Sequence, residues 1–191
     1  MSGFDTQGHM SSHGEPVAWS DEQLSEIAQI LERYPEKRAA TLPLLWMAQR
    51  SFGWISYEVC RLVGTTLDLP PSHVLSVATF YTMYKKAPTG KHLIQVCHTL
   101  SCALAGSERV VATIRDKLGI REGETTADGT FTLMRVECLA ACGAGPMMQI
   151  DDDFHELLDD DKVHAILDAL AEGRTVDRPE LDQWVYSTPA S

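Results

Sequence analysis

Hydrophobic side chains recur at helical spacing from about residue 20 onward. The first run, spaced by three, four and three residues, consists of Leu24, Ile27, Leu31 and Tyr34. It follows a capping box in which Ser20 is the N-cap and Gln23 is the third helical residue. Pro35 then stops the run. This pattern predicts an amphipathic helix.

A second and a third helix follow the same logic. Thr41 can cap the second, and Gly53 can end it in the left-handed conformation. Ser56 caps the third, which is predicted over 57–63 with its end near Gly64.

A fourth helix opens at Pro70 and is predicted to place Lys85 and Lys86 in its last turn, where cations favour the helix dipole. Residues 19–88 are therefore expected to form a helical bundle. Cys60 lies among apolar neighbours on the third helix, and we interpret it as a small buried hydrophobe rather than a ligand.

The pattern changes after residue 90. Short apolar and β-branched runs predict strands over 92–96, 131–136, 147–150 and 154–158. Helical spacing returns twice, from the cap Ser107 to Gly119 and from the cap Asp160 to Gly173. The order strand, helix, strand, strand, strand, helix predicts a small α/β domain over 89–173.

The two ends of the chain lack such patterning. Residues 1–18 are polar and are expected to be a disordered N-terminal extension, and 174–191 a loose C-terminal tail. The N-terminus has no apolar core of a secretory signal, and no apolar run approaches the ~20 residues of a membrane span. We expect no direct membrane insertion and a cytoplasmic protein.

Charge narrows the possible partners. The formal net charge is −11 over 191 residues, which argues against nucleic acid and against an anionic membrane surface.

Four of the five cysteines form two close pairs. Cys97 and Cys102 have four residues between them, and Cys138 and Cys142 have three. Each pair is predicted to lie in a loop just past a strand end, with the loop 98–106 carrying Cys102. Two such pairs can supply four thiolates to one metal site, and a [2Fe–2S] cluster with one pair per iron is the leading interpretation.

Other uses of the cysteines compete with a cluster. Structural zinc also binds two cysteine pairs at such spacings, so a zinc-stabilised interaction module remains open. A thioredoxin-type dithiol needs Cys-x-x-Cys, which is absent, and disulfides are disfavoured in a cytosol. A Rieske centre uses two histidines, an arrangement that His98 beside Cys97 does not make.

Small residues accompany the cysteines and would let backbone N–H groups approach cluster sulfurs. Four larger apolar side chains are expected to keep water away: Leu100, Leu139, Met147 and Met148.

A string of motifs in the right order resembles the 24 kDa subunit family of respiratory complex I, called NuoE in bacteria. The match runs over roughly 22–170 and includes Gly53-Trp54-Ile55, Val77-Ala78-Thr79-Phe80-Tyr81, Ser101-Cys102-x-Leu104-x-Gly106 and Val136-Glu137-Cys138-Leu139-x-Ala141-Cys142.

The resemblance implies an α/β fold with an N-terminal helical bundle followed by a thioredoxin-like [2Fe–2S] domain. It implies that Cys97, Cys102, Cys138 and Cys142 hold the cluster, and that no catalytic residue, NADH site or FMN site belongs to this chain. The cluster would exchange single electrons near the flavin of an NADH-oxidising partner subunit. Other peripheral-arm subunits would complete a complex on the cytoplasmic side of the inner membrane.

Two positions depart from the family. Ala140 stands where the family commonly has glycine, and Gly145-Pro146 stands where Ala-Pro is common. The same module also serves NAD-dependent formate dehydrogenases and NAD-reducing hydrogenases. A freestanding ferredoxin is a further possibility, against which the bundle argues.

Overall fold

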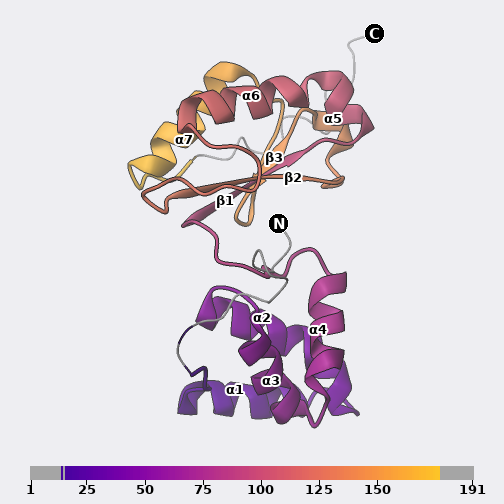
Figure 1. The fold of residues 1–191 in the computed structure, drawn as a ribbon. Helices are drawn as coiled ribbons and strands as arrows, with labels where there is room; N and C mark the ends of the chain where they lie inside the picture. The colour runs from indigo at the N-terminus through magenta and orange to yellow at the C-terminus, as the bar shows by residue number, and fades with distance from the viewer. Residues whose placement is uncertain (1–13, 15, 177–191) are drawn as a thin grey trace. The chain divides into compact units, whose positions relative to one another are not determined.

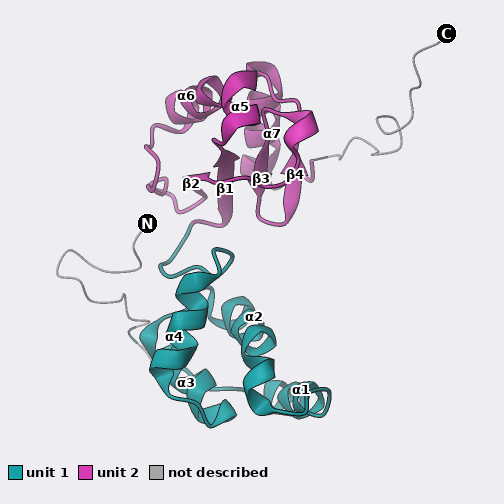
Figure 2. Cartoon of the chain, turned by 90° about the vertical axis from the view of Figure 1, so that its right-hand side faces the viewer, with its two compact units in different colours: residues 1–89 teal, residues 90–191 magenta. Residues whose placement is uncertain are grey.

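A computed structural model describes residue 14 and residues 16–176 of the chain. The chain divides into two compact units, residues 1–89 and residues 90–191 (Figure 2). The predictions for residues 1–13 and 177–191 lie outside the described residues. Each unit has its own hydrophobic core.

The first unit is helical (Figure 1). Its elements are α1 Asp21–Leu31, the 3₁₀ helix η1 Lys37–Ala40, α2 Thr41–Phe52, α3 Tyr57–Leu67 and α4 Pro71–Phe80. The capping box at Ser20 and Gln23 is present, with both reciprocal hydrogen bonds formed. Gly53 follows α2 with a φ of 83°, as its position predicts.

The core of this unit is built from one face of each helix. Its largest fully buried side chains include Leu44, Leu45, Val59 and Tyr84. Tyr84 donates a hydrogen bond of 3.0 Å from its hydroxyl to the carbonyl of Leu42. Cys60 is fully buried, and burial raises the pKa of its thiol to about 12. The interpretation of Cys60 as a small core residue is confirmed.

Helix α3 extends beyond its predicted end. It continues through Gly64 to Leu67 and ends at Asp68, which adopts the left-handed conformation. A Cβ placed on Gly64 would lie 2.7 Å from the carbonyl oxygen of Leu69. The glycine is therefore needed because the chain turning into α4 passes close to it, not because the helix ends there.

Three other predicted boundaries in this unit were wrong. Helix α1 ends at Leu31, before Pro35 is reached. Thr41 is the first residue of α2 rather than its cap. Helix α4 ends at Phe80, so Lys85 and Lys86 lie outside it.

The second unit is a mixed α/β domain. Its elements are β1 His92–Cys97, α5 Leu100–Ala105, α6 Ser107–Leu118, β2 Phe131–Val136, the 3₁₀ helix η2 Cys142–Ala144, β3 Met148–Ile150, β4 Asp153–His155 and α7 Asp160–Ala171. The sheet order is β2-β1-β3-β4. Strand β1 is parallel to β2 and antiparallel to β3, which is antiparallel to β4. The predicted strands and both predicted helices are found in the predicted order, with one further helix, α5, inside the predicted loop 98–106.

Helices α6 and α7 lie together over one face of the sheet (Figure 1). One cluster of buried apolar residues joins the two helices to the sheet. It includes Ile94, Leu133, Met148, Ile114 and Leu167. The fourth strand is shorter than predicted because Leu157, with a φ of 49°, has already left extended geometry.

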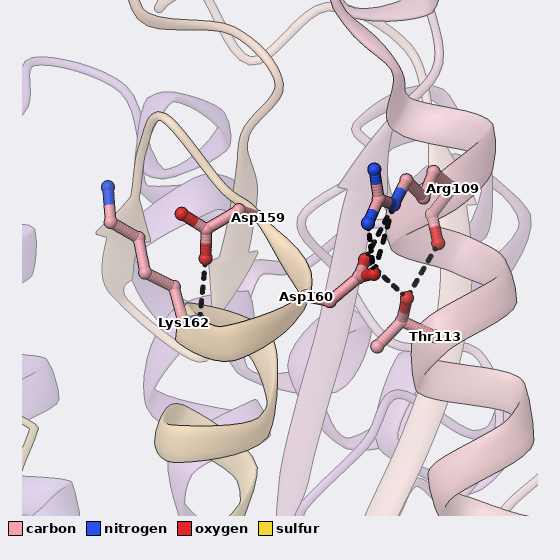
Figure 3. A network of polar contacts seen from close by, with 5 residues as sticks. All are labelled: Arg109, Thr113, Asp159, Asp160 and Lys162. Carbon is pink, nitrogen blue, oxygen red and sulfur yellow. Dashed lines mark hydrogen bonds and ion pairs between the residues drawn. The ribbon is translucent and has the colours of Figure 1, made fainter.

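A polar contact holds the start of α7 against α6 (Figure 3). The guanidinium Nε of Arg109 donates to both carboxylate oxygens of Asp160 at 3.0 Å, and the Thr113 hydroxyl donates to the same carboxylate at 2.9 Å. These bonds lower the pKa of Asp160, with Arg109 as the largest cause. Asp159, not Asp160, caps the helix by accepting from the Lys162 N–H at 2.8 Å.

The predicted cap of α6 was also misplaced. Ser107 is the first helical residue, and Gly106 stands at the cap with a φ of 105°. Among the described residues, no helix is long and apolar enough to cross a membrane.

Candidate metal centre

The parallel pairing of β1 and β2 brings the two cysteine pairs to one edge of the sheet. Cys97 is the last residue of β1 and lies opposite Val136, the last residue of β2. Cys138 follows two residues later, and Cys142 begins η2. Because parallel strands end at the same edge, residues that follow them meet there.

Cys102 reaches the site from a helix rather than a loop. The predicted loop 98–106 contains α5, and Cys102 lies on the buried side of this helix. Six residues are too few for apolar periodicity to reveal a helix.

The site has an inner and an outer pair of thiols. Cys97 and Cys102 are each 2% exposed and pack with the buried Met147. Cys138 and Cys142 are exposed, with their Sγ atoms 3.3 Å apart. All five cysteines of the chain are free.

Burial and hydrogen bonding act in opposite directions on the inner pair. Burial raises the pKa of Cys97, but hydrogen bonds from Thr99, Cys102 and the backbone of Leu139 lower it overall. Burial and the hydrogen bond to Cys97 raise the pKa of Cys102 to about 11, although the Met147 backbone opposes this.

The two thiols of the outer pair also have pKa values that are shifted in opposite directions. The backbone N–H of Ala140 donates to Cys138 Sγ at 3.3 Å and is the largest cause of its lowered pKa. The hydrogen bond to Cys138 raises the pKa of Cys142. In each pair, one thiol therefore has a lowered pKa and the other a raised pKa. Full ionisation of four neighbouring thiols needs positive charge between them, which bound iron supplies.

The donor set fits a two-iron cluster. The sulfurs lie as two close pairs, and a [2Fe–2S] cluster uses two thiolates on each iron. A Cβ placed on Gly145 would lie 3.4 Å from Cys102 Sγ, so the residue present leaves the backbone close to that sulfur.

The prediction that four apolar side chains keep water away from the cysteines is confirmed only in part. Met147 and Met148 are buried, and Leu139 packs against the inner cysteines. Leu100, however, is 75% exposed, because it lies on the opposite side of α5 from Cys102. Of the outer pair, Cys142 borders an open cleft of about 610 Å³ that is lined mainly by apolar residues and also by Lys162.

Two contributors were not identified from the sequence. Thr99 places its hydroxyl 3.2 Å from Cys97 Sγ. Ala140 has a φ of 66°, and this conformation points its N–H at Cys138. The family's usual glycine at this position was the signal for the second, since a left-handed residue favours glycine.

A profile of the thioredoxin-like [2Fe–2S] ferredoxins matches residues 27–171, well over half of the chain. The chain belongs to this family. The cofactor of the family is a [2Fe–2S] cluster, and its thioredoxin-like fold agrees with the α/β architecture described above.

The chain matches its relatives over most of their length. It is 42% identical over 156 residues to an NADH-quinone oxidoreductase subunit of Rickettsia bellii, covering 80% of this chain and 93% of that protein. It is 39% identical over 172 residues to NADH-quinone oxidoreductase subunit 2 of Thermus thermophilus, covering 86% and 93%. The predicted resemblance to the NuoE family is confirmed.

A solved structure shares the fold. An NAD⁺-reducing [NiFe]-hydrogenase in its air-oxidised state superposes with a TM-score of 0.60 at 19% identity. The match covers 74% of this chain and 24% of that chain. At this identity the likeness concerns the fold alone.

Proposed function

We propose that the protein is the [2Fe–2S] electron-transfer subunit of an NADH-quinone oxidoreductase. The observation that carries the proposal is the meeting of two close cysteine pairs at one sheet edge. It is supported by relatives of that complex which the chain matches over nearly their whole length. The activity is that of the whole complex, of which this chain is a subunit.

The four ligands are Cys97, Cys102, Cys138 and Cys142. The cluster supplies one-electron chemistry when it is bound, and the protein sets its position and potential. The inner pair anchors it in a dry setting beside Met147. Backbone N–H groups, including that of Ala140, point at the sulfurs and stabilise their negative charge.

The partner is the flavin-bearing, NADH-oxidising subunit of the same complex. Cys138 and Cys142 are exposed, so the electron path to a partner is shortest on this side. The chain itself would bind neither NADH nor FMN, and would lie in the peripheral arm on the cytoplasmic side of the inner membrane. The fold also suits the hydrogenase, but the sequence relatives named above favour the quinone-reducing complex.

The test is spectroscopic. Anaerobically purified protein is assayed for iron, zinc and acid-labile sulfide, and its EPR spectrum is recorded after one-electron reduction. We expect two irons and two sulfides per chain. Zinc without sulfide, even after cluster reconstitution, would contradict the proposal and favour a zinc-stabilised interaction module.

Two variants assign the ligands. Cys138→Ser should destroy the normal cluster spectrum, because an alkoxide replaces a thiolate on one iron. Cys60→Ser is the matched control, since Cys60 lies in the core of the other unit, and its spectrum should be unchanged. An unchanged spectrum in Cys138→Ser would refute the ligand assignment.

A further inference from the structure

Thr99 stands in a capping position but does not cap. It precedes the first residue of α5 with φ −76° and ψ 170°, the backbone geometry of an N-cap. Threonine at such a position usually accepts a hydrogen bond from a backbone N–H of the first turn. Here the side chain makes no capping bond. Its hydroxyl oxygen lies 3.2 Å from Cys97 Sγ instead.

The same side chain also reaches the other pair of cysteines. The Thr99 side chain is also among the lesser causes that lower the pKa of Cys138. Thr99 is therefore placed between the inner pair, through Cys97, and the outer pair, through Cys138. The Thr99 hydroxyl therefore contacts a cysteine sulfur and does not stabilise the start of α5.

The hydroxyl must be the donor when the sulfurs hold iron. A cluster thiolate carries no proton, so it can only accept a hydrogen bond, whereas a threonine hydroxyl can donate one. The other donors described at these sulfurs are backbone N–H groups, such as those of Leu139 and Ala140, or the cysteines themselves. Among these contacts, the Thr99 hydroxyl is the non-cysteine donor that a substitution can remove.

We propose that Thr99 tunes the reduction potential of the cluster by donating a hydrogen bond from its hydroxyl to the Cys97 thiolate. The inference rests on the proposed function, because it requires a cluster. One-electron reduction adds a negative charge to the cluster while no bond forms or breaks. A donor at a cluster sulfur stabilises the more negative state, and the potential is therefore higher with the hydroxyl present.

The experiment compares Thr99→Val, Thr99→Ser and wild type in the full chain with its cluster. Each is titrated with redox mediators while the EPR signal of the reduced cluster is followed. Thr99→Val should lower the equilibrium constant for reduction about three- to tenfold, which is about 28 to 59 mV for one electron. Thr99→Ser keeps the hydroxyl and should remain close to wild type.

Thr79→Val is the matched control. Thr79 lies on α4 in the other unit, where its hydroxyl donates to the Leu75 carbonyl at 2.9 Å. The same chemical change there should leave the potential unaltered. A potential in Thr99→Val equal to that of wild type, at full iron and sulfide content, would overturn the inference.

Two further measurements keep the result decisive. If Thr99→Val does not hold a cluster, Thr99→Ala removes the hydroxyl with less bulk and is titrated in its place. Pulsed EPR of the reduced wild type in D₂O should also show an exchangeable deuteron that is missing from the variant without the hydroxyl. If that deuteron coupling is retained, Thr99 is not the donor. A wild type without iron and sulfide would contradict the proposed function itself.

Discussion

Replacing Ala140 by glycine should strengthen the metal centre. Ala140 has a φ of 66°, in the left-handed region where a Cβ crowds the following carbonyl oxygen. This strain amounts to about 1–2 kcal/mol for a residue with a Cβ. Glycine removes it but loses about 0.4–1 kcal/mol through the greater entropy of the unfolded chain. The balance favours Ala140→Gly by about 0.5–1 kcal/mol.

A second alanine-to-glycine substitution in the same loop serves as a control, because it should have the opposite effect on stability. Ala144 lies in η2 and is not among the non-glycine residues with positive φ. Ala144→Gly relieves no such strain and incurs only the entropic term of about 0.4–1 kcal/mol. One chemical change should therefore stabilise the loop at position 140 and destabilise it four residues later.

The assay is the rate of cluster loss. Visible absorbance is followed at a fixed urea concentration with a chelator present. We expect Ala140→Gly to lose its cluster about two- to fivefold more slowly than wild type, and Ala144→Gly faster by a similar factor. Ala140→Val, a β-branched residue in the left-handed region, should be faster than wild type. Equal rates for the glycine and valine variants at position 140 would refute the reasoning.

Three further predictions concern stability. Gly64→Ala should lower the free energy of unfolding of the helical unit by about 1–3 kcal/mol, measured by urea denaturation, because the new Cβ would lie 2.7 Å from the Leu69 carbonyl oxygen. Tyr84→Phe should lower it by about 1 kcal/mol in the same assay, because the hydrogen bond from the Tyr84 hydroxyl to the Leu42 carbonyl is lost. The folded pKa of Asp160 is lowered, so its stabilising effect is present above the unfolded pKa and is lost as pH falls through the folded one. The stability difference between wild type and Asp160→Asn should therefore be largest near pH 7 and vanish in acid, as a pH series of urea midpoints would show.

The helices of the first unit were predictable because their signals are local. Ser20 with Gln23, and Gly53, act within one turn of the chain, and they are found in the predicted roles. Gly64 was misinterpreted because the requirement for it comes from a neighbouring segment. A glycine inside an apolar run is compatible with a helix end or with a close approach, and local sequence does not distinguish the two.

The meeting of the cysteine pairs was predictable for a different reason. Two short runs of apolar and β-branched residues, each followed by cysteine, imply a common sheet edge if the strands are parallel, and β1 and β2 are parallel. The parallel pairing therefore predicts that Cys97 and Cys138 lie near each other, without any knowledge of side-chain contacts. Which pair is buried depends on α5, whose six residues carry too little periodicity to be recognised.

Thr99 shows where local reasoning reaches its limit. Its residue type and its backbone geometry both favour a helix cap, and a sequence-based interpretation would assign it that role. The outcome depends on whether the hydroxyl points toward the first-turn N–H groups, from which its oxygen would accept, or toward a sulfur, to which it can donate. The position of Cys97 at the end of β1, two residues before Thr99, places that sulfur within reach of the hydroxyl. The capping bond that Thr99 forgoes is worth about 1 kcal/mol, and a hydrogen bond donated to a charged cluster sulfur offsets that loss. The absence of an expected local bond is therefore what directs attention to Thr99 as part of the metal centre.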